Sequence, residues 1–375
     1  LAGSAAATDP ALQSSIVVIE NDIVPGVGPI SWIESVSVEP GGHVLVTARV
    51  SGATLLTDQV VLRDGPTDVV LREGDDAPGI ATTEVIGTIT SARLDAQGRL
   101  VWSAWLRQLP GLPTTTRQVL AIDDRPVLFS DDPAGWPGAN PGTVYESFEH
   151  ARFAGDRLFL AAHIADPTKP GLTQPYLGFV DPLTGAEEKV VTQGDPAPHL
   201  GGTVSFINIS DAHFSDANAA GQAIYSVISV GELNEPISAT YLDDEPLAVQ
   251  WRASPLPGRS WFKLGGPVAL SDSGETLFSG EVGRSPETSQ VIVRDGVVLV
   301  EQSVTSLAEI APSTIDSIFS EPLGLGDDGD VLHHAFWGGS PSGQNQGIVL
   351  GDRLVLREGT TSVDGQPIIN ISGSG

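Results

Sequence analysis

The chain has 375 residues, 47 of them acidic and 19 basic, and a formal net charge of −28. This charge excludes a nucleic-acid-binding surface, because contacts with phosphates need a basic face. The absence of cysteine excludes disulfides and thiolate metal sites. No apolar run approaches the roughly 18 residues that a membrane span needs, so we expect no membrane-spanning segment.

Glycines and prolines, 43 and 28 in number, separate β-branched runs along the whole chain. This pattern predicts an all-β protein. Residues 1–14 are expected to form an N-terminal tail. Their sequence, LAGSAAATDP and onward, resembles the region that follows a signal-peptide cleavage site. It contains no initiator methionine, so we interpret the chain as a processed or partial one that is secreted to the extracellular space or cell surface.

One phrase recurs along the chain. Residues 69–79 read VVLREGDDAPG, which is a short apolar strand, a charged turn and a Pro-Gly stop. Copies of this phrase that match less closely lie at residues 17–26, 127–138, 190–202, 247–258 and 354–359. Repetition of this kind indicates a repeat architecture rather than a catalytic motif.

Each repeat is predicted to contain four strands, with a glycine in the turn between the first and the second. A four-stranded unit of this length predicts a single β-propeller of six to seven blades, with a β-solenoid as the alternative. The repeat domain covers residues 15–375, with units near 30–79, 85–138, 144–202, 204–258, 262–303 and 315–359. The turn glycines are Gly42, Gly98, Gly155, Gly221, Gly274 and Gly329.

Two phrases of the repeat resemble a known family. The NAAGQAIY stretch that starts at Asn218 is similar to the NxxGxxAF motif of the bacterial choice-of-anchor tandem-repeat proteins, and Asp95 and Ser271 start weaker copies. The REGDDAPG phrase resembles a second signature of the same family. The resemblance implies export and attachment to the cell surface, and it implies no catalytic residue. The chain departs from the motif at Glu39, Arg152 and Gly326.

Two strands remain outside the six units. Residues 15–19 are predicted to form an outer strand, and residues 366–372 are predicted to form an inner strand. In a closed ring they could share one blade, but no second or third strand lies between them. Because unpaired strand edges are templates for another chain, we expect a homo-oligomer or polymer joined by these strands. Local closure of one ring is the alternative. The predicted assembly residues are Ile16, Val17, Val18, Ile368, Ile369 and Ile371.

Candidate catalytic and metal-binding residues are few. His333 and His334 are neighbours in a strand, so their rings point to opposite faces, and we expect one packed and one exposed. No catalytic residue and no cofactor is predicted, apart from calcium. Pairs of aspartates recur in turns, and solvation is the first interpretation of each pair. Calcium is the second, because it takes carboxylate and carbonyl oxygens. The candidate ligands are Asp327, Asp328 and Asp330.

The seven tryptophans could form a carbohydrate platform or pack between blades. Trp102 and Trp105 lie three positions apart and are predicted to face opposite sides of a strand. Trp136 is the one to test for exposure, because it lies in a proline-rich loop. We therefore predict an exported, non-enzymatic structural or interaction protein that assembles into an extracellular filament or surface layer. The alternative is a secreted propeller enzyme or lectin that acts on an extracellular glycan. Exposed carboxylates and tryptophans gathered at one end of the channel would favour that alternative.

Overall fold

A computed structural model describes residues 17–39, 42–52, 57–80, 83–108, 116–209, 214–231, 235–284, 286–326, 329–339, 343–363 and 366–367. Every strand in this part of the chain pairs with its neighbour in an antiparallel sheet. No helix in it is long and apolar enough to cross a membrane. The predicted N-terminal tail, residues 1–14, lies outside the described residues.

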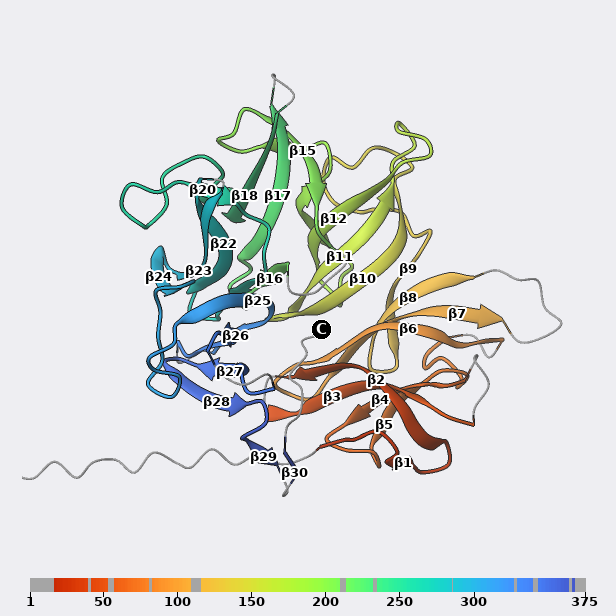
Figure 1. Cartoon of the computed structure of the whole chain (residues 1–375). Helices are drawn as coiled ribbons and strands as arrows, with labels where there is room; N and C mark the ends of the chain where they lie inside the picture. The colour runs from red at the N-terminus through yellow and green to blue at the C-terminus, as the bar shows by residue number, and fades with distance from the viewer. Residues whose placement is uncertain are drawn as a thin grey trace, which may run out of the picture.

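Six antiparallel sheets form a ring, so the predicted propeller is confirmed and has six blades (Figure 1). Within a blade, four strand positions follow one another in chain order, from the long inner strand near the ring axis to the outer strand. Blade 1 contains β1 (Ile23–Val24), β2 (Gly28–Val38), β3 (Val44–Val50), β4 (Gln59–Arg63) and β5 (Val69–Arg72). Blade 2 contains β6 (Glu84–Leu94), β7 (Leu100–Gln108), β8 (Arg117–Ile122) and β9 (Arg125–Phe129). Blade 3 contains β10 (Val144–Ala154), β11 (Arg157–Ala165), β12 (Thr173–Val180) and β13 (Glu187–Thr192).

In the second half of the ring, the inner strands of two blades are interrupted. Blade 4 contains β14 (Pro196–Ala197), β15 (Gly202–Ile207), β16 (Ser215–Ala217), β17 (Ala223–Gly231), β18 (Pro236–Leu242) and β19 (Glu245–Val249). Blade 5 contains β20 (Trp261–Lys263), β21 (Val268–Leu270), β22 (Thr276–Arg284), β23 (Glu287–Arg294) and β24 (Val297–Glu301). Blade 6 contains β25 (Ile315–Leu325), β26 (Val331–Trp337), β27 (Gln346–Leu350) and β28 (Arg353–Arg357). A short hairpin follows, made of β29 (Ser362–Val363) and β30 (Gln366–Pro367).

The recurring phrase proves to be the connector between blades. After outer strand β5, Gly74 N donates to Ile86 O at 2.7 Å, and Ile86 N donates to Asp75 O at 2.9 Å. These two hydrogen bonds tie the connector to the inner strand of blade 2. The same pair of bonds joins Asn21 and Asp22 to Ile30 at the start of blade 1. Residues 17–26 therefore lead into blade 1 as the later copies lead into their blades.

Glutamine side chains clamp neighbouring blades together. Gln59 is the first residue of β4 in blade 1. Its side-chain amide accepts a hydrogen bond from Ile89 N of blade 2 at 2.7 Å and donates one to Ile89 O at 3.1 Å. Gln118 of blade 2 brackets Phe148 of blade 3 in the same way, at 2.6 and 2.7 Å. A β-bulge in each gripped inner strand leaves these backbone groups free to bond. The clamp satisfies buried polar groups that strand pairing leaves open.

The core consists of apolar clusters between blades. In β7, Trp102 packs toward blade 1 and Val101 packs toward blade 3, because successive side chains point to opposite faces. Five clusters of this kind join blades 1 to 6 in sequence. The sixth cluster, which includes Val46, Ala48 and Val60, draws its described residues from blade 1 and the segment that leads into it. The boundary between blades 6 and 1 is called the seam below.

Three predicted strands need correction: the inner strands of units four and five and the outer strand 15–19. The sequence predicts these two inner strands over residues 204–214 and 262–270, and each is interrupted. In blade 5 the break falls at Gly265, Gly266 and Pro267, where proline offers no N–H. Of the predicted outer strand 15–19, residues 17–19 are described and are not in a strand. Of the predicted inner strand 366–372, residues 366–367 are described, and they pair with β29.

Candidate functional site

The ring places equivalent residues of the inner strands at one level. In five blades the connector forms backbone hydrogen bonds with one residue of the inner strand, and a β-bulge follows that residue. The first residue after the bulge that pairs with the second strand is Trp32, Ser147, Phe206, Lys263 or Ser317. Trp32 is 59% exposed and Phe206 is 51% exposed. Bulges often re-aim side chains next to functional sites. Exposed aromatic rings at this level are a feature that a carbohydrate-binding surface uses.

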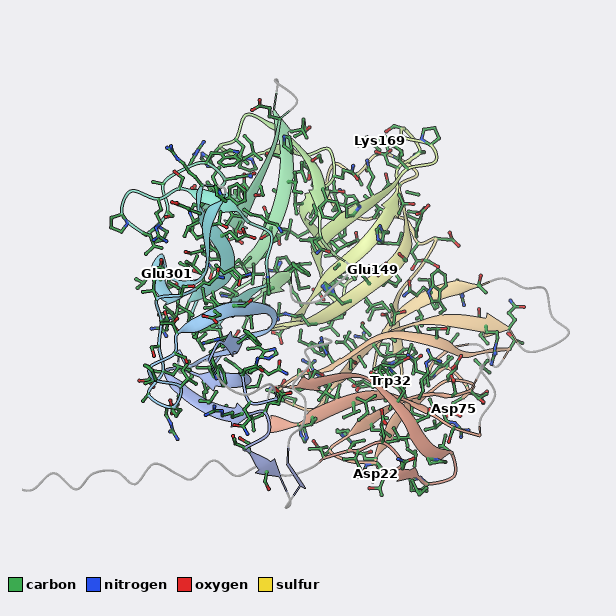
Figure 2. All side chains as sticks on the ribbon, in the orientation of Figure 1. Asp22, Trp32, Asp75, Glu149, Lys169 and Glu301 are labelled. Carbon is green, nitrogen blue, oxygen red and sulfur yellow. The ribbon has the colours of Figure 1, made fainter. Side chains whose placement is uncertain are left out.

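Two glutamates lie two residues further along the inner strands, Glu34 on β2 and Glu149 on β10, and Figure 2 labels Glu149. Glu34 accepts from Arg49 Nε at 2.6 Å and from Gln59 Nε2 at 2.7 Å. Glu149 accepts from Ser147 Oγ at 3.1 Å and lies 3.5 Å from His163 Nε2. Both carboxylates are thus held by neighbouring side chains, and those contacts orient them.

Charged side chains also join the blades at the opposite end of the inner strands. Arg152 forms an ion pair with Asp216 and donates to Ala217 O in blade 4. Asp216 in turn accepts from Leu270 N of blade 5 at 2.7 Å. In blade 1, Glu39 accepts from Leu94 N of blade 2 at 3.0 Å. Glu39 and Arg152, which depart from the NxxGxxAF pattern, are therefore cross-blade contacts.

The Arg152 guanidinium has an unusual environment. Its Nε atom is buried, and burial lowers the pKa of Arg152 to about 10 because the charged form loses hydration. The charge of Arg93 lowers the pKa further, while Asp272 and Glu39 act in the opposite direction. Arg152 still carries its charge near neutral pH, so it can hold acidic partners from several blades.

The two adjacent histidines are both buried, with 1% of His333 and 2% of His334 exposed. The expectation that one of them would be exposed is wrong, because neighbouring structure covers both faces of β26. The rings point to opposite faces, as the strand alternation predicted, so they do not form a shared metal site. Burial lowers the pKa of His333 to about 4.

The aspartate turns have a structural role. Asp64, Asp123, Asp243 and Asp295 each begin the tight turn between the third and fourth strands, with φ between 47° and 57°. Each carboxylate accepts a hydrogen bond of 2.8 Å from the backbone N–H that starts the second strand of its blade. Aspartate tolerates this left-handed conformation, which explains its repetition there.

No group of three or more potential metal ligands occurs among the described residues. Of the predicted calcium ligands, Asp330 is described and exposed, whereas Asp327 and Asp328 lie outside the described residues. Calcium binding therefore stays a prediction.

The tryptophans divide between core and surface. Trp136 was predicted to be the candidate for exposure, yet it is 6% exposed and stacks on Tyr176 with 4.6 Å between ring centroids. The connector folds back over blade 3 and covers it. The opposite orientations predicted for Trp102 and Trp105 are confirmed, with exposures of 0% and 38%.

The predicted assembly residues lie at the seam or outside the described chain. Val17 and Val18 are half-buried, and Val18 packs against the cluster of blade 1. Ile16, Ile368, Ile369 and Ile371 lie outside the described residues. The hairpin β29–β30 lies beside β28, at the edge of the ring between blades 6 and 1 (Figure 1).

Comparisons with known proteins add little to this geometry. No protein-family model matches the chain, and no curated protein sequence matches it. Among solved structures, the α-L-arabinofuranosidase from Lactobacillus brevis is similar over 94% of this chain and 98% of its own, with 10% sequence identity and a TM-score of 0.26. Similarity at this level carries no argument about activity, and the resemblance to the choice-of-anchor repeats stays a prediction.

Proposed function

We propose that this protein is an exported, non-enzymatic structural or interaction protein whose copies join at the seam into an extracellular filament or surface layer. The seam carries the proposal. At the other five boundaries, apolar residues of two blades pack together, whereas the cluster at the seam draws its described residues from blade 1 and its leading segment. We infer that a further strand docks at the edge of this boundary.

Connectors flank the seam on both sides. Glu358 N donates to Gln346 O at 3.1 Å, as Glu73 N donates to Gln59 O in blade 1. The β29–β30 hairpin then turns toward the ring in the way that β14 and β15 do in blade 4. By the repeat pattern of the sequence, residues 366–372 are predicted to form an inner strand and residues 15–19 an outer strand.

An inner and an outer strand cannot pair with each other directly. They are separated by three strand spacings, or about 14 Å, because neighbouring strands lie 4.7–4.9 Å apart. The repeat pattern of the sequence assigns no second or third strand of this chain between them. We propose that a second copy supplies the missing partners, with the Ile369–Ile371 region of one chain pairing against the seam of the next.

The experiment that tests this proposal compares the wild type with the double variant Ile369→Asp/Ile371→Asp. Light scattering after size exclusion measures the mass, and electron microscopy shows the assemblies. We expect concentration-dependent polymers for the wild type and single rings for the variant, because carboxylates cannot enter an apolar face unpaired.

The matched control is Leu183→Asp, which places the same charge at an exposed leucine of the β12–β13 turn, 80% exposed and far from the seam. This control should assemble like the wild type. Single rings for the wild type at every concentration would falsify the proposal. Assemblies of unchanged size in the double variant would do so as well.

A further inference from the structure

A cavity of about 400 Å³ lies between blades 5 and 6, where the inner strand of blade 5 is interrupted. Its walls combine charged and polar side chains with glycine backbone and one aromatic ring. The residues used below are Phe214, Lys263, Gly265, Ser279, Glu281 and Gln290. This volume suits a small molecule rather than a chain segment.

The repeat explains how the cavity arises. In blade 1 the amide of Gln59 also donates to Glu34, at 2.7 Å, and in blade 2 that of Gln118 donates to Thr90, at 2.8 Å. Both acceptors lie four residues after the inner-strand residue that bonds to the connector, which is Ile30 in blade 1 and Ile86 in blade 2. In blade 5 the same position is Gly265, which has no side chain and has φ of +105°. One partner of the glutamine is therefore missing.

Gln290 consequently has an amide donor available. Its Oε1 accepts from Ile318 N at 2.9 Å, so the carbonyl half of the clamp is formed. No described residue accepts a hydrogen bond from its Nε2, in contrast to Gln59 and Gln118. Gln290 is half-buried and lines the cavity. A ligand oxygen in the cavity can take the place of the missing acceptor.

The charges beside the cavity balance each other. Lys263 on β20 and Glu281 on β22 are register partners, yet no ion pair joins them among the described contacts. Lys263 and Gln290 Nε2 can donate hydrogen bonds, Glu281 can accept them, and the Ser279 hydroxyl can do both. Phe214 adds an apolar surface. The combination fits a neutral ligand with many hydroxyl groups better than it fits an anion.

We propose that this cavity binds a sugar residue of monosaccharide size. Its hydroxyls would fill the acceptor position opposite Gln290 and bridge Lys263 to Glu281, while one face of its ring packs against Phe214. The proposal goes beyond assembly through the seam. It adds a glycan-binding site at the boundary between blades 5 and 6, where one apolar cluster joins the two blades.

The test titrates D-glucose, D-galactose and N-acetyl-D-glucosamine at millimolar concentration, with saturation-transfer NMR and calorimetry as readouts. We expect at least one sugar to bind saturably. Lys263→Ala and Glu281→Ala should each weaken that sugar about tenfold, the effect of losing one charge-assisted hydrogen bond. Lys263 is exposed and Glu281 is half-buried, and unchanged thermal melting would show that the variants fold.

Matched controls remove the same charges elsewhere. The control variants are Lys169→Ala, at a residue in the loop between β11 and β12 of blade 3 (Figure 2), and Glu309→Ala, at a residue in the connector before blade 6. Neither should change sugar affinity. Absence of saturable binding for all three sugars overturns the proposal, and so does binding that Lys263→Ala and Glu281→Ala leave unchanged. Binding of acetate without any sugar would show an anion site and would overturn it too.

Discussion

At the scale of single residues, burial changes the chemistry of side chains that look polar in the sequence. His333 is 1% exposed, and its pKa falls to about 4 because the protonated ring cannot be hydrated there. The ring is therefore neutral in the folded protein under ordinary conditions. A buried neutral histidine is a packing residue, and it makes stability depend on pH.

The sign of that dependence follows from proton binding. Between pH 6.5, the ordinary pKa of histidine, and pH 4, the unfolded chain binds a proton at residue 333 and the folded chain does not. Acidification through this window thus favours unfolding, by up to about 3 kcal/mol for this one group. The variant His333→Leu should lose less stability than the wild type between pH 7 and pH 4. Urea unfolding at both pH values measures the difference, and equal losses in the two proteins would contradict the assignment.

At the scale of elements, the connector carries the repeat. Its Pro-Gly stop reverses the chain at a glycine with positive φ, as at Gly26 and Gly79 with φ of 72° and 68°. Their surroundings differ. A Cβ at Gly26 would meet nothing within 4 Å, whereas a Cβ at Gly79 would lie 1.9 Å from Asp124 O. Alanine at Gly26 should therefore show only the free-energy cost of the backbone conformation. Alanine at Gly79 should show this cost and that of a steric clash.

This pair gives a matched experiment. Gly26→Ala should lower the free energy of unfolding by about 1–2 kcal/mol, the cost of a left-handed conformation for a residue with Cβ. Gly79→Ala should cost at least about 2 kcal/mol more, because the backbone of the β8–β9 turn must move. Denaturant unfolding of both variants measures the difference. Equal destabilisation of the two variants would show that the backbone at Asp124 shifts without a loss of folding free energy.

At the scale of the whole molecule, the ring is uneven. Inner strand β10 has four buried apolar side chains spaced along it, Tyr145, Phe148, Ala151 and Ala154. Inner strand β2, next to the seam, buries Ile30, and Val36 and Val38 are 55% and 75% exposed. Local stability follows the density of buried contacts. Blade 1 should therefore be the part of the ring that opens first.

Hydrogen exchange followed by mass spectrometry tests this expectation. In dilute protein, peptides from β2 should exchange faster than peptides from β10, since fewer buried contacts hold them closed. At concentrations where copies assemble through the seam, exchange in β2 should slow while exchange in β10 stays unchanged. Equal rates for the two strands in dilute protein would mean that the seam is packed as tightly as the other boundaries.

The sequence by itself determined the fold class, the six repeats and most strands. These depend on local properties: alternation of apolar residues, glycines that adopt positive φ and prolines that end strands. It also showed that Trp102 and Trp105 face opposite ways, because strand geometry alternates regardless of the surroundings. The connector phrase was visible too, although its role in tying one blade to the next was not.

Only the tertiary structure decided what surrounds each residue. His333 and His334 are both buried because material covers both faces of β26, and Trp136 is buried because the connector folds back on Tyr176. The clamp at Gln118, the contacts of Arg152 and the missing partner of Gln290 join residues of different strands or blades. Such contacts depend on register and on ring closure. No local sequence pattern encodes these contacts, so they can be identified only in the tertiary structure, where the blades lie side by side.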